Sequence, residues 1–357
     1  MRRVLAGVVV LVILAAPVFS ARNDSPVGAL MEGGHWKRAR AQVMPRVQAN
    51  PNDAESAYLL SRVKQAFGDF EGALRSAEKS VELNGNNAEY HANLADICGE
   101  MAGTAGMFKG LSLARRFRKE AEAAIAIDSK NIDAREGLVE FYLEAPGIAG
   151  GDKQKARAIA EEIVKIDPSR GYMMRARIAQ NEKDLAKQEA ALLDAVKANP
   201  NHYSAQVRLA EFYLSDKVNK PDQAEKAAHE AVKVDAGRAN AYAVLAQVYA
   251  SQGRSTDLDA LLAQAEKNVP DDLTADYRAG RTFLLAGKEL SRAEKYFRKY
   301  LGQEQEAHEP SAGAAHWRLG LVLEKEGRKS EAIAELEAAV QLDPKLEDAK
   351  KDLKRLK

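Results

Sequence analysis

His91 and Cys98 are the pair of residues whose types and spacing come closest to those of a metal site. Seven positions are about two turns of an α-helix, so both side chains would lie on one helical face and could converge on a metal ion. No second pair in the sequence supplies the remaining ligands. Both positions also fit the apolar stripe of a predicted helix, and we therefore expect core packing here and no bound metal.

Motifs for nucleophilic or phosphate chemistry give little support to catalysis. Ser61 and Ser76 each begin an SxxK pattern, ending at Lys64 and Lys79, but the companion SDN and KTG motifs are absent. The sequence also lacks HExxH, GxSxG, GxGxxG and GxxxxGK[ST]. We expect no catalytic residue and no cofactor, and predict that the protein is not an enzyme.

Two further segments could bind charged groups. Lys109 and the run Arg115–Lys119 form the densest basic segment, which could meet an acidic partner or lipid head groups; a solvated helix face is the simpler interpretation. The glycines of Ala145–Asp152 could present backbone N–H groups to an anion, but an ordinary long turn is the simpler interpretation. With 53 basic and 52 acidic side chains, the near-neutral chain does not favour nucleic-acid binding.

The first 20 residues form a separate unit. Arg2 and Arg3 precede an apolar run, Val4–Ala16, which is typical of a cleavable secretory signal cut after Ser20 or Ala21. The run is shorter than the roughly 20 residues of a membrane span. We expect a periplasmic or secreted protein of bacterial origin without a membrane span after cleavage. An uncleaved membrane anchor and a eukaryotic secretory origin are the alternatives.

The helices that position these side chains are clearest between Ala314 and Pro344. Small or apolar residues at His316, Leu319, Gly320 and Leu323 predict one buried helical stripe. Gly327 then breaks the pattern because glycine tolerates positive φ. A second stripe, at Ala332, Ile333, Leu336, Ala339 and Val340, ends before Pro344 because proline cannot continue a helix.

The same two-helix pattern recurs along the chain. We predict an all-α solenoid, a superhelix of stacked antiparallel helix pairs, with a partial repeat at 21–53 and a capping helix at 346–357. Its eight repeats span about 54–87, 88–131, 132–168, 169–201, 202–238, 239–272, 273–306 and 313–346. The second repeat carries an insertion, Glu100–Gly110, which must bulge out or extend one helix. Gln188 replaces a small crossing residue in the fourth, and a charged linker occupies Gly302–Gly313.

This pattern resembles the tetratricopeptide repeat. The matching positions are His316, Leu319, Gly320, Leu323, Ala332, Leu336, Ala339 and Pro344. The resemblance implies a non-catalytic scaffold that binds a protein or peptide segment on a concave surface built from the first helix of each pair. An enzyme, or an accessory subunit of a complex that processes an envelope polymer, is the alternative class.

The resemblance also implies which residues line that surface. The acidic set comprises Glu89, Asp96, Glu100, Asp133, Glu136, Glu140 and Glu144. The apolar and aromatic set comprises Tyr277, Arg281, Leu284, Leu285, Trp317 and Leu321. Together they predict a partly basic, partly hydrophobic protein partner, unless the carboxylates serve only solubility. Tyr58, Ala92 and Glu136 replace the Lys/Asn clamp with which chaperone adaptors of this family hold a terminal carboxylate, which disfavours chaperone-tail binding.

Overall fold

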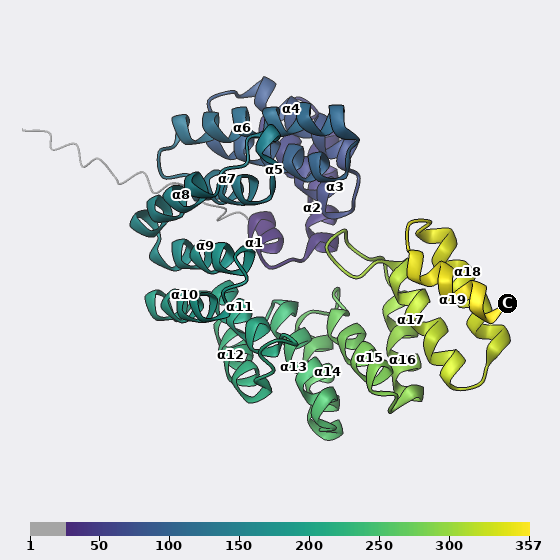
Figure 1. Ribbon diagram of the computed structural model, residues 1–357. Coiled ribbons are helices and arrows are strands. Elements are labelled where there is room, and N and C mark those ends of the chain that lie inside the picture. Colours follow the sequence, from purple (N-terminus) through teal and green to yellow (C-terminus); the bar gives the residue numbers. More distant parts are fainter. Residues whose placement is uncertain (1–25) are drawn as a thin grey trace, which may run out of the picture.

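The structure, a computed structural model, describes residues 26–357. The predicted signal segment, 1–20, lies outside the described residues. Residues 26–357 form 19 α-helices and one 3-10 helix, with no strand among them. None of these helices is long and apolar enough to cross a membrane. Successive antiparallel pairs stack into a superhelix (Figure 1), which confirms the predicted all-α solenoid.

The helices follow one another with short turns. They are α1 (Pro26–Glu32), α2 (Trp36–Ala49), α3 (Ala54–Ala66), α4 (Phe70–Leu83), α5 (Ala88–Thr104), α6 (Met107–Ile127), α7 (Ile132–Glu144), η1 (Gly147–Ala149), α8 (Lys153–Ile166), α9 (Pro168–Asn181), α10 (Leu185–Ala198), α11 (Tyr203–Leu214), α12 (Pro221–Val234), α13 (Ala239–Gln252), α14 (Ser255–Asn268), α15 (Thr274–Ala286), α16 (Leu290–Leu301), α17 (Ala312–Lys325), α18 (Lys329–Leu342) and α19 (Glu347–Leu356).

Local sequence explains where many of these helices begin. The Asp53 carboxylate accepts a hydrogen bond from the Ser56 backbone N–H, and Asn131 does the same for Ala134. Such N-caps satisfy backbone donors that have no partner within the helix. Fully buried alanines, such as Ala156, lie where the two helices of a pair cross. Small side chains at these crossings allow the close helix packing on which the stack depends.

The insertion in the second pair lengthens both of its helices. The additional residues continue α5 to Thr104 and begin α6 at Met107, whereas we expected a bulge or one longer helix. A second extended helix is possible because the sequence Ala105–Gly106 makes a tight reversal, with Gly106 as the N-cap of α6. The side chains of Met107 and Phe108 stand exposed at this reversal.

His91 and Cys98 differ in environment. The Cys98 side chain is fully buried, and burial raises the pKa of its thiol to about 11. His91 is instead part of a polar contact: its Nδ1 lies 2.7 Å from Glu120 Oε2, and its Nε2 lies 3.1 Å from the Gly85 carbonyl oxygen. Among residues 26–357, no group of three His, Cys, Asp or Glu side chains is arranged to hold a metal.

His316 makes the corresponding contact in the eighth pair, with its Nδ1 2.6 Å from Glu335 Oε2. The prediction that His91 and His316 belong to the apolar stripe is therefore wrong. At both positions an imidazole on the first helix faces a carboxylate on the second, so the two helices of the pair are joined by a polar contact at the margin of the core. The position of a histidine in the apolar pattern of one helix could not reveal this contact, because the carboxylate partner lies on the other helix.

The linker between α16 and α17 connects the C-terminal part of the solenoid to its N-terminal helices. We call residues 302–311 the strap. In Figure 1 it reaches from α17 to α2 and α3. Arg40 donates two hydrogen bonds to the Glu304 carboxylate, at 3.0 and 2.6 Å, and the Ala307 N–H donates to the Ala66 carbonyl at 2.7 Å. The superhelix is thus closed on itself.

Asp271, in the turn between α14 and α15, forms a second closing contact. Arg38 donates to its carboxylate at 3.0 and 2.5 Å, and His35 Nδ1 lies 3.2 Å from Oδ1. The Lys37 ammonium donates to the Asp271 backbone carbonyl at 2.7 Å. Burial opposes ionisation of Asp271, but these contacts dominate and hold its pKa well below the usual range. The residues joined here are 236 positions apart.

Two carboxyl groups of the strap oppose this closure when they ionise. Burial and the neighbouring Glu309 raise the pKa of Glu306 to about 8, although Lys37, 3.8 Å away, lowers it in part. Burial and Asp272 raise the pKa of Glu309 to about 7. In an undocked strap both groups would titrate near their ordinary pKa of about 4.3. The docked strap therefore binds protons more tightly than the undocked one.

We expect docking of the strap to weaken as pH rises. Docking is unaffected by these groups below about pH 4, where both states are protonated, and is progressively disfavoured up to about pH 8. Hydrogen exchange at Ala307, corrected for its intrinsic pH dependence, should show protection falling about tenfold or more between pH 5 and 8.5. The double variant Glu306→Gln/Glu309→Gln should remain protected at pH 8.5; an unchanged pH profile in that variant would contradict this origin.

Candidate functional site

The concave face carries a depression of about 910 Å³. Its lining residues come chiefly from the first helices of successive pairs, α3, α5, α7, α9 and α11. The end of α1 contributes Glu32, and Figure 1 shows α1 inside the curve of the superhelix. Because each first helix presents one short row of side chains, the depression has the shape of a groove that crosses several repeats.

Most of the acidic residues expected at this surface do line it. Glu89, Asp96, Asp133, Glu136 and Glu140 belong to the depression. Carboxylates outnumber arginines among its lining residues. The structure thus brings the larger part of the acidic set together. Glu100 and Glu144 are not among the lining residues, and contact their neighbours as described below.

Arg170 on α9 neutralises part of the acidic set. Its guanidinium donates to the Glu136 carboxylate at 2.8 and 2.6 Å and also forms an ion pair with Asp133. Burial lowers the pKa of Arg170, but its hydrogen bonds with Glu136 outweigh burial and raise the pKa above its ordinary value. Glu136 therefore already has a bidentate partner within the protein.

Arg177, two turns further along α9, does the same for the next carboxylates. It donates from Nε to both oxygens of Glu140 at 2.9 Å and from its terminal nitrogen to Glu144 at 2.6 Å. Part of the expected acidic set is therefore neutralised by arginines of the next repeat. Arg170 and Arg177 follow Glu136 and Glu140 by 34 and 37 residues, about one repeat, so this spacing could have revealed both pairs.

Asp96 and Glu100 have a neutral partner. The Gln65 amide on α3 donates to Asp96 at 2.7 Å and to Glu100 at 2.9 Å. No cation takes part in this contact. His202, which also lines the depression, acts as the N-cap of α11 by accepting from the Ala205 N–H, and burial lowers its pKa. The depression thus offers side chains suited to ion pairs and hydrogen bonds with a polypeptide.

The apolar set does not form a continuous surface. Tyr277 and Leu284 are only 5% and 4% exposed, so the prediction that they line the groove is wrong. The Tyr277 ring packs between Phe297 and Tyr300, with centroid separations of 5.5 and 5.0 Å. Both residues belong to the core because α15 packs against both α13 and α16.

The remaining members of the apolar set lie in different environments. Leu285 is 70% exposed, whereas Arg281 and Leu321 are half-buried. Trp317 is also half-buried, and its indole N–H donates to Asp352 on α19 at 2.9 Å. Trp317 therefore helps to hold the C-terminal helix, a contact that the repeat pattern alone does not predict.

Comparisons with known proteins identify the repeat. Family profiles of the tetratricopeptide repeat match residues 169–202, 216–257 and 292–347. No curated protein matches the chain. The chain thus contains tetratricopeptide repeats, in the region where the sequence pattern resembled them.

Solved structures with a similar fold include two whose likeness extends over most of their length. The crystal structure of yeast Tom70 has a TM-score of 0.52 and 14% sequence identity, over 92% of this chain and 86% of that one. The crystal structure of PilW, a widely conserved type IV pilus biogenesis factor, has a TM-score of 0.47 and 21% identity, over 63% of this chain and 99% of that one. At these identities the likeness is one of fold.

Proposed function

We propose that this protein is a non-catalytic scaffold that binds a segment of a partner protein on its concave face. The observation that carries the proposal is the 910 Å³ depression, which five successive first helices line with charged and polar side chains. A polypeptide laid along such a groove would meet ionic groups and hydrogen-bond partners from several repeats at once. Arrays of this kind bind extended segments because every repeat adds contacts along one direction.

The partner segment in this proposal has mixed charge. The excess of carboxylates over arginines in the depression favours basic groups on the segment near α5 and α7. Arg170 and Arg177 hold Glu136 and Glu140, so a partner arginine would compete with these pairs for the carboxylates. A segment with both signs of charge can instead extend the ion-pair network that is already present.

We also propose that the protein acts in the cell envelope or outside the cell. The support is the apolar run Val4–Ala16 behind Arg2 and Arg3. If the signal is not cleaved, the same segment would anchor the scaffold at the membrane, with the solenoid on the exported side.

Site-specific crosslinking tests this proposal. A photoreactive p-benzoylphenylalanine is placed at Ala92 or at Ser204, both in the depression, and in a matched control at Glu122, an exposed residue of α6 outside it. The full chain is expressed in its source cells and irradiated there. We expect the same partner protein to be crosslinked from Ala92 and Ser204 and not from Glu122, and the recovered chain to begin at Ala21 or Arg22.

Two results would count against the proposal. Equal crosslinking from Glu122 and from the depression would show that the concave face has no special role. Recovery only from the cytoplasm, with the N-terminal segment intact, would remove the export part and leave the binding part to be judged by the crosslinks.

A further inference from the structure

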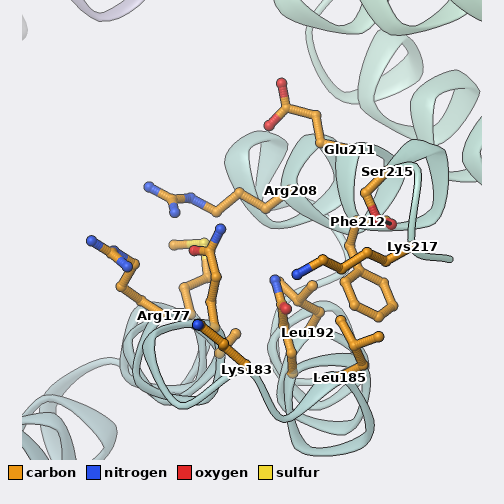
Figure 2. A pocket seen from close by; sticks show the side chains of 13 residues that line it. Arg177, Lys183, Leu185, Leu192, Arg208, Glu211, Phe212, Ser215 and Lys217 are labelled. Carbon is orange, nitrogen blue, oxygen red and sulfur yellow. Dashed lines mark hydrogen bonds between the residues drawn. The ribbon is translucent and has the colours of Figure 1, made fainter.

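A smaller pocket of about 270 Å³ lies between α9, α10 and α11, at the end of the pair that holds the α9–α10 turn. Figure 2 shows it from close by. Apolar side chains from all three helices line it: Met173, Ala176, Leu185, Leu192 and Phe212. Met173 and Arg208 belong both to this pocket and to the concave depression, so the two are adjacent.

Gln188 marks the local reason for the pocket. It is the fourth residue of α10, and the fourth residue of the second helix in five other pairs is a fully buried alanine: Ala73, Ala156, Ala224, Ala293 and Ala332. Gln188 is only half-buried and lines the pocket. A longer polar side chain at the crossing cannot be enclosed as alanine is, which leaves open space beside it.

Three cations around the pocket have no partner within the part of the chain that the structure describes. Lys183, Arg208 and Lys217 line it, and their side chains make no hydrogen bond or ion pair with other residues of 26–357. Arg177, a fourth lining cation, is already held by Glu140 and Glu144. The pocket therefore has an apolar floor and a rim with positive charge that no side chain of the described part, residues 26–357, pairs with.

Glu211 is the acidic residue among those that line the pocket, and it does not offset this charge. Its carboxylate lies 3.7 Å from Arg278, on α15. In Figure 2 it points away from the side chains of Arg177, Lys183 and Lys217. The acidic residue that lines the pocket thus faces a cation of α15, which does not line the pocket.

The backbone of Lys183 supplies an independent observation. Its φ is 60°, in the left-handed region, and the corresponding turns of four other pairs carry glycine there: Gly68, Gly253, Gly287 and Gly327. Glycine adopts this conformation without strain, whereas an L-residue with a Cβ does not. The turn by itself therefore favours glycine, and the lysine at this position places an ammonium group beside the pocket at the expense of local stability.

We infer that this pocket binds an acidic stretch of the partner segment, in which a leucine or phenylalanine enters the apolar floor and neighbouring carboxylates pair with Lys183, Arg208 and Lys217. The inference rests on the proposed function, because it concerns the same partner on the adjoining surface. A protein segment fits better than a small organic ligand, since the volume is below the 300–1,000 Å³ typical of small-molecule sites. It suits one large anchoring side chain.

A set of amidated 12-residue peptides tests the inference by fluorescence anisotropy with the folded chain. Each has leucine, phenylalanine or serine at its centre, flanked by glutamates, serines or lysines. We expect the tightest binding for an apolar centre with glutamate flanks. Lys183→Gly and Lys217→Ala should each raise the Kd of that peptide about two- to fivefold, and together about tenfold or more. Leu185→Ser should weaken binding of the peptide with an apolar centre in particular.

Two variants distinguish an effect on peptide binding from an effect on folding. Lys183→Gly installs the residue that four other turns carry, so its thermal stability should equal or exceed that of the parent chain while its affinity falls. Lys288→Ala, in the corresponding α15–α16 turn away from the pocket, is the matched charge control and should leave Kd unchanged.

Three outcomes would overturn the inference: no binding of any glutamate-flanked peptide, equal binding of lysine- and glutamate-flanked peptides, or affinity unaffected by Lys183→Gly and Lys217→Ala. Octanoate, a small apolar anion, is tested as a competitor. Octanoate binding that depends on Lys183, without any peptide binding, would also contradict the inference, because the pocket would then be a site for a small ligand and not for a protein segment. The crosslinks from Ala92 test the proposed function separately. Failure of the proposed function can therefore be distinguished from failure of the inference about this pocket.

Discussion

Replacement of Gly171 by alanine is expected to destabilise the fourth repeat by about 3 kcal/mol. Gly171 lies in α9 where it meets α8. A Cβ at this position would lie 2.4 Å from the Val164 backbone nitrogen and 2.5 Å from Val164 Cα. Backbone atoms cannot rotate out of the way as a side chain can, so the two helices would have to separate. Urea unfolding, followed by circular dichroism, should show a lower midpoint.

Gly103→Ala is the matched control for this prediction. Gly103 is also helical, in α5, but an added Cβ there would have no atom within 4 Å apart from its own helix and chain neighbours. Alanine should stabilise that helix by about 0.5–1 kcal/mol because it restricts the unfolded chain. In a solenoid, the damage from Gly171→Ala should be confined to neighbouring repeats, which hydrogen exchange can map. A midpoint like that of Gly103→Ala would show that α8 and α9 are not packed this closely.

The double variant Asp271→Ala/Arg40→Ala is expected to open the closed superhelix. Asp271→Ala removes the carboxylate that faces His35 and Arg38, and Arg40→Ala removes the bidentate contact with Glu304 in the strap. The Arg40–Glu304 pair is exposed and should contribute about 0.2–1 kcal/mol, whereas a hydrogen bond to the partly buried Asp271 carboxylate contributes about 1.5–3 kcal/mol. With both gone, the junction would retain the Ala307-to-Ala66 backbone hydrogen bond, the Lys37–Glu306 ion pair and the Lys37 hydrogen bond to the backbone carbonyl at position 271.

Spin labels across the junction can measure this opening. Cysteines are placed at Met44 on α2 and at His308 in the strap, both exposed, while the buried native Cys98 remains unlabelled in the folded chain. The parent chain should give one narrow distance distribution by pulsed electron spin resonance, and the double variant a longer and broader one. Asp257→Ala, which removes an exposed local partner of Arg254, is the control and should not alter the distribution.

Retention of the narrow distribution in the double variant would show that helix stacking alone brings the strap and the N-terminal helices together. That result would also change the explanation of the pH dependence expected for Glu306 and Glu309, since the strap would then rest on a superhelix that closes without it. Opening, in contrast, would identify the strap and Asp271 as the contacts that determine how far the concave face is enclosed.

Helix pairing was predictable because its causes are local. The apolar stripe around Leu319, the break at Gly327 and the small residue at Ala332 act within one 34-residue unit. Most of the acidic residues of the concave face were predictable too, since their register within the repeat places them on the first helix. Arg170, the partner of Glu136, lies 34 residues later, about one repeat along the chain. This ion pair could therefore have been predicted from the same register.

Other features depend on how the units combine. The burial of Tyr277 depends on how closely neighbouring helices cover α15, and the indole contact of Trp317 depends on where α19 docks. Neither is a property of one repeat. Gln188 shows an intermediate case. The substitution is visible in the sequence, but the pocket beside it, with Lys183 and Lys217 at its rim, requires the positions of three helices.

The sequence by itself determined that this protein is a stack of helix pairs with a first-helix surface, because short-range periodicity is sufficient to specify each pair. Only the tertiary structure decided that the stack closes, with His35 beside Asp271 at a separation of 236 residues. The physical reason is that superhelical curvature is the sum of small rotations between neighbouring repeats. No single repeat encodes that sum, so the residues that meet at the junction share no pattern from which their contact could be predicted.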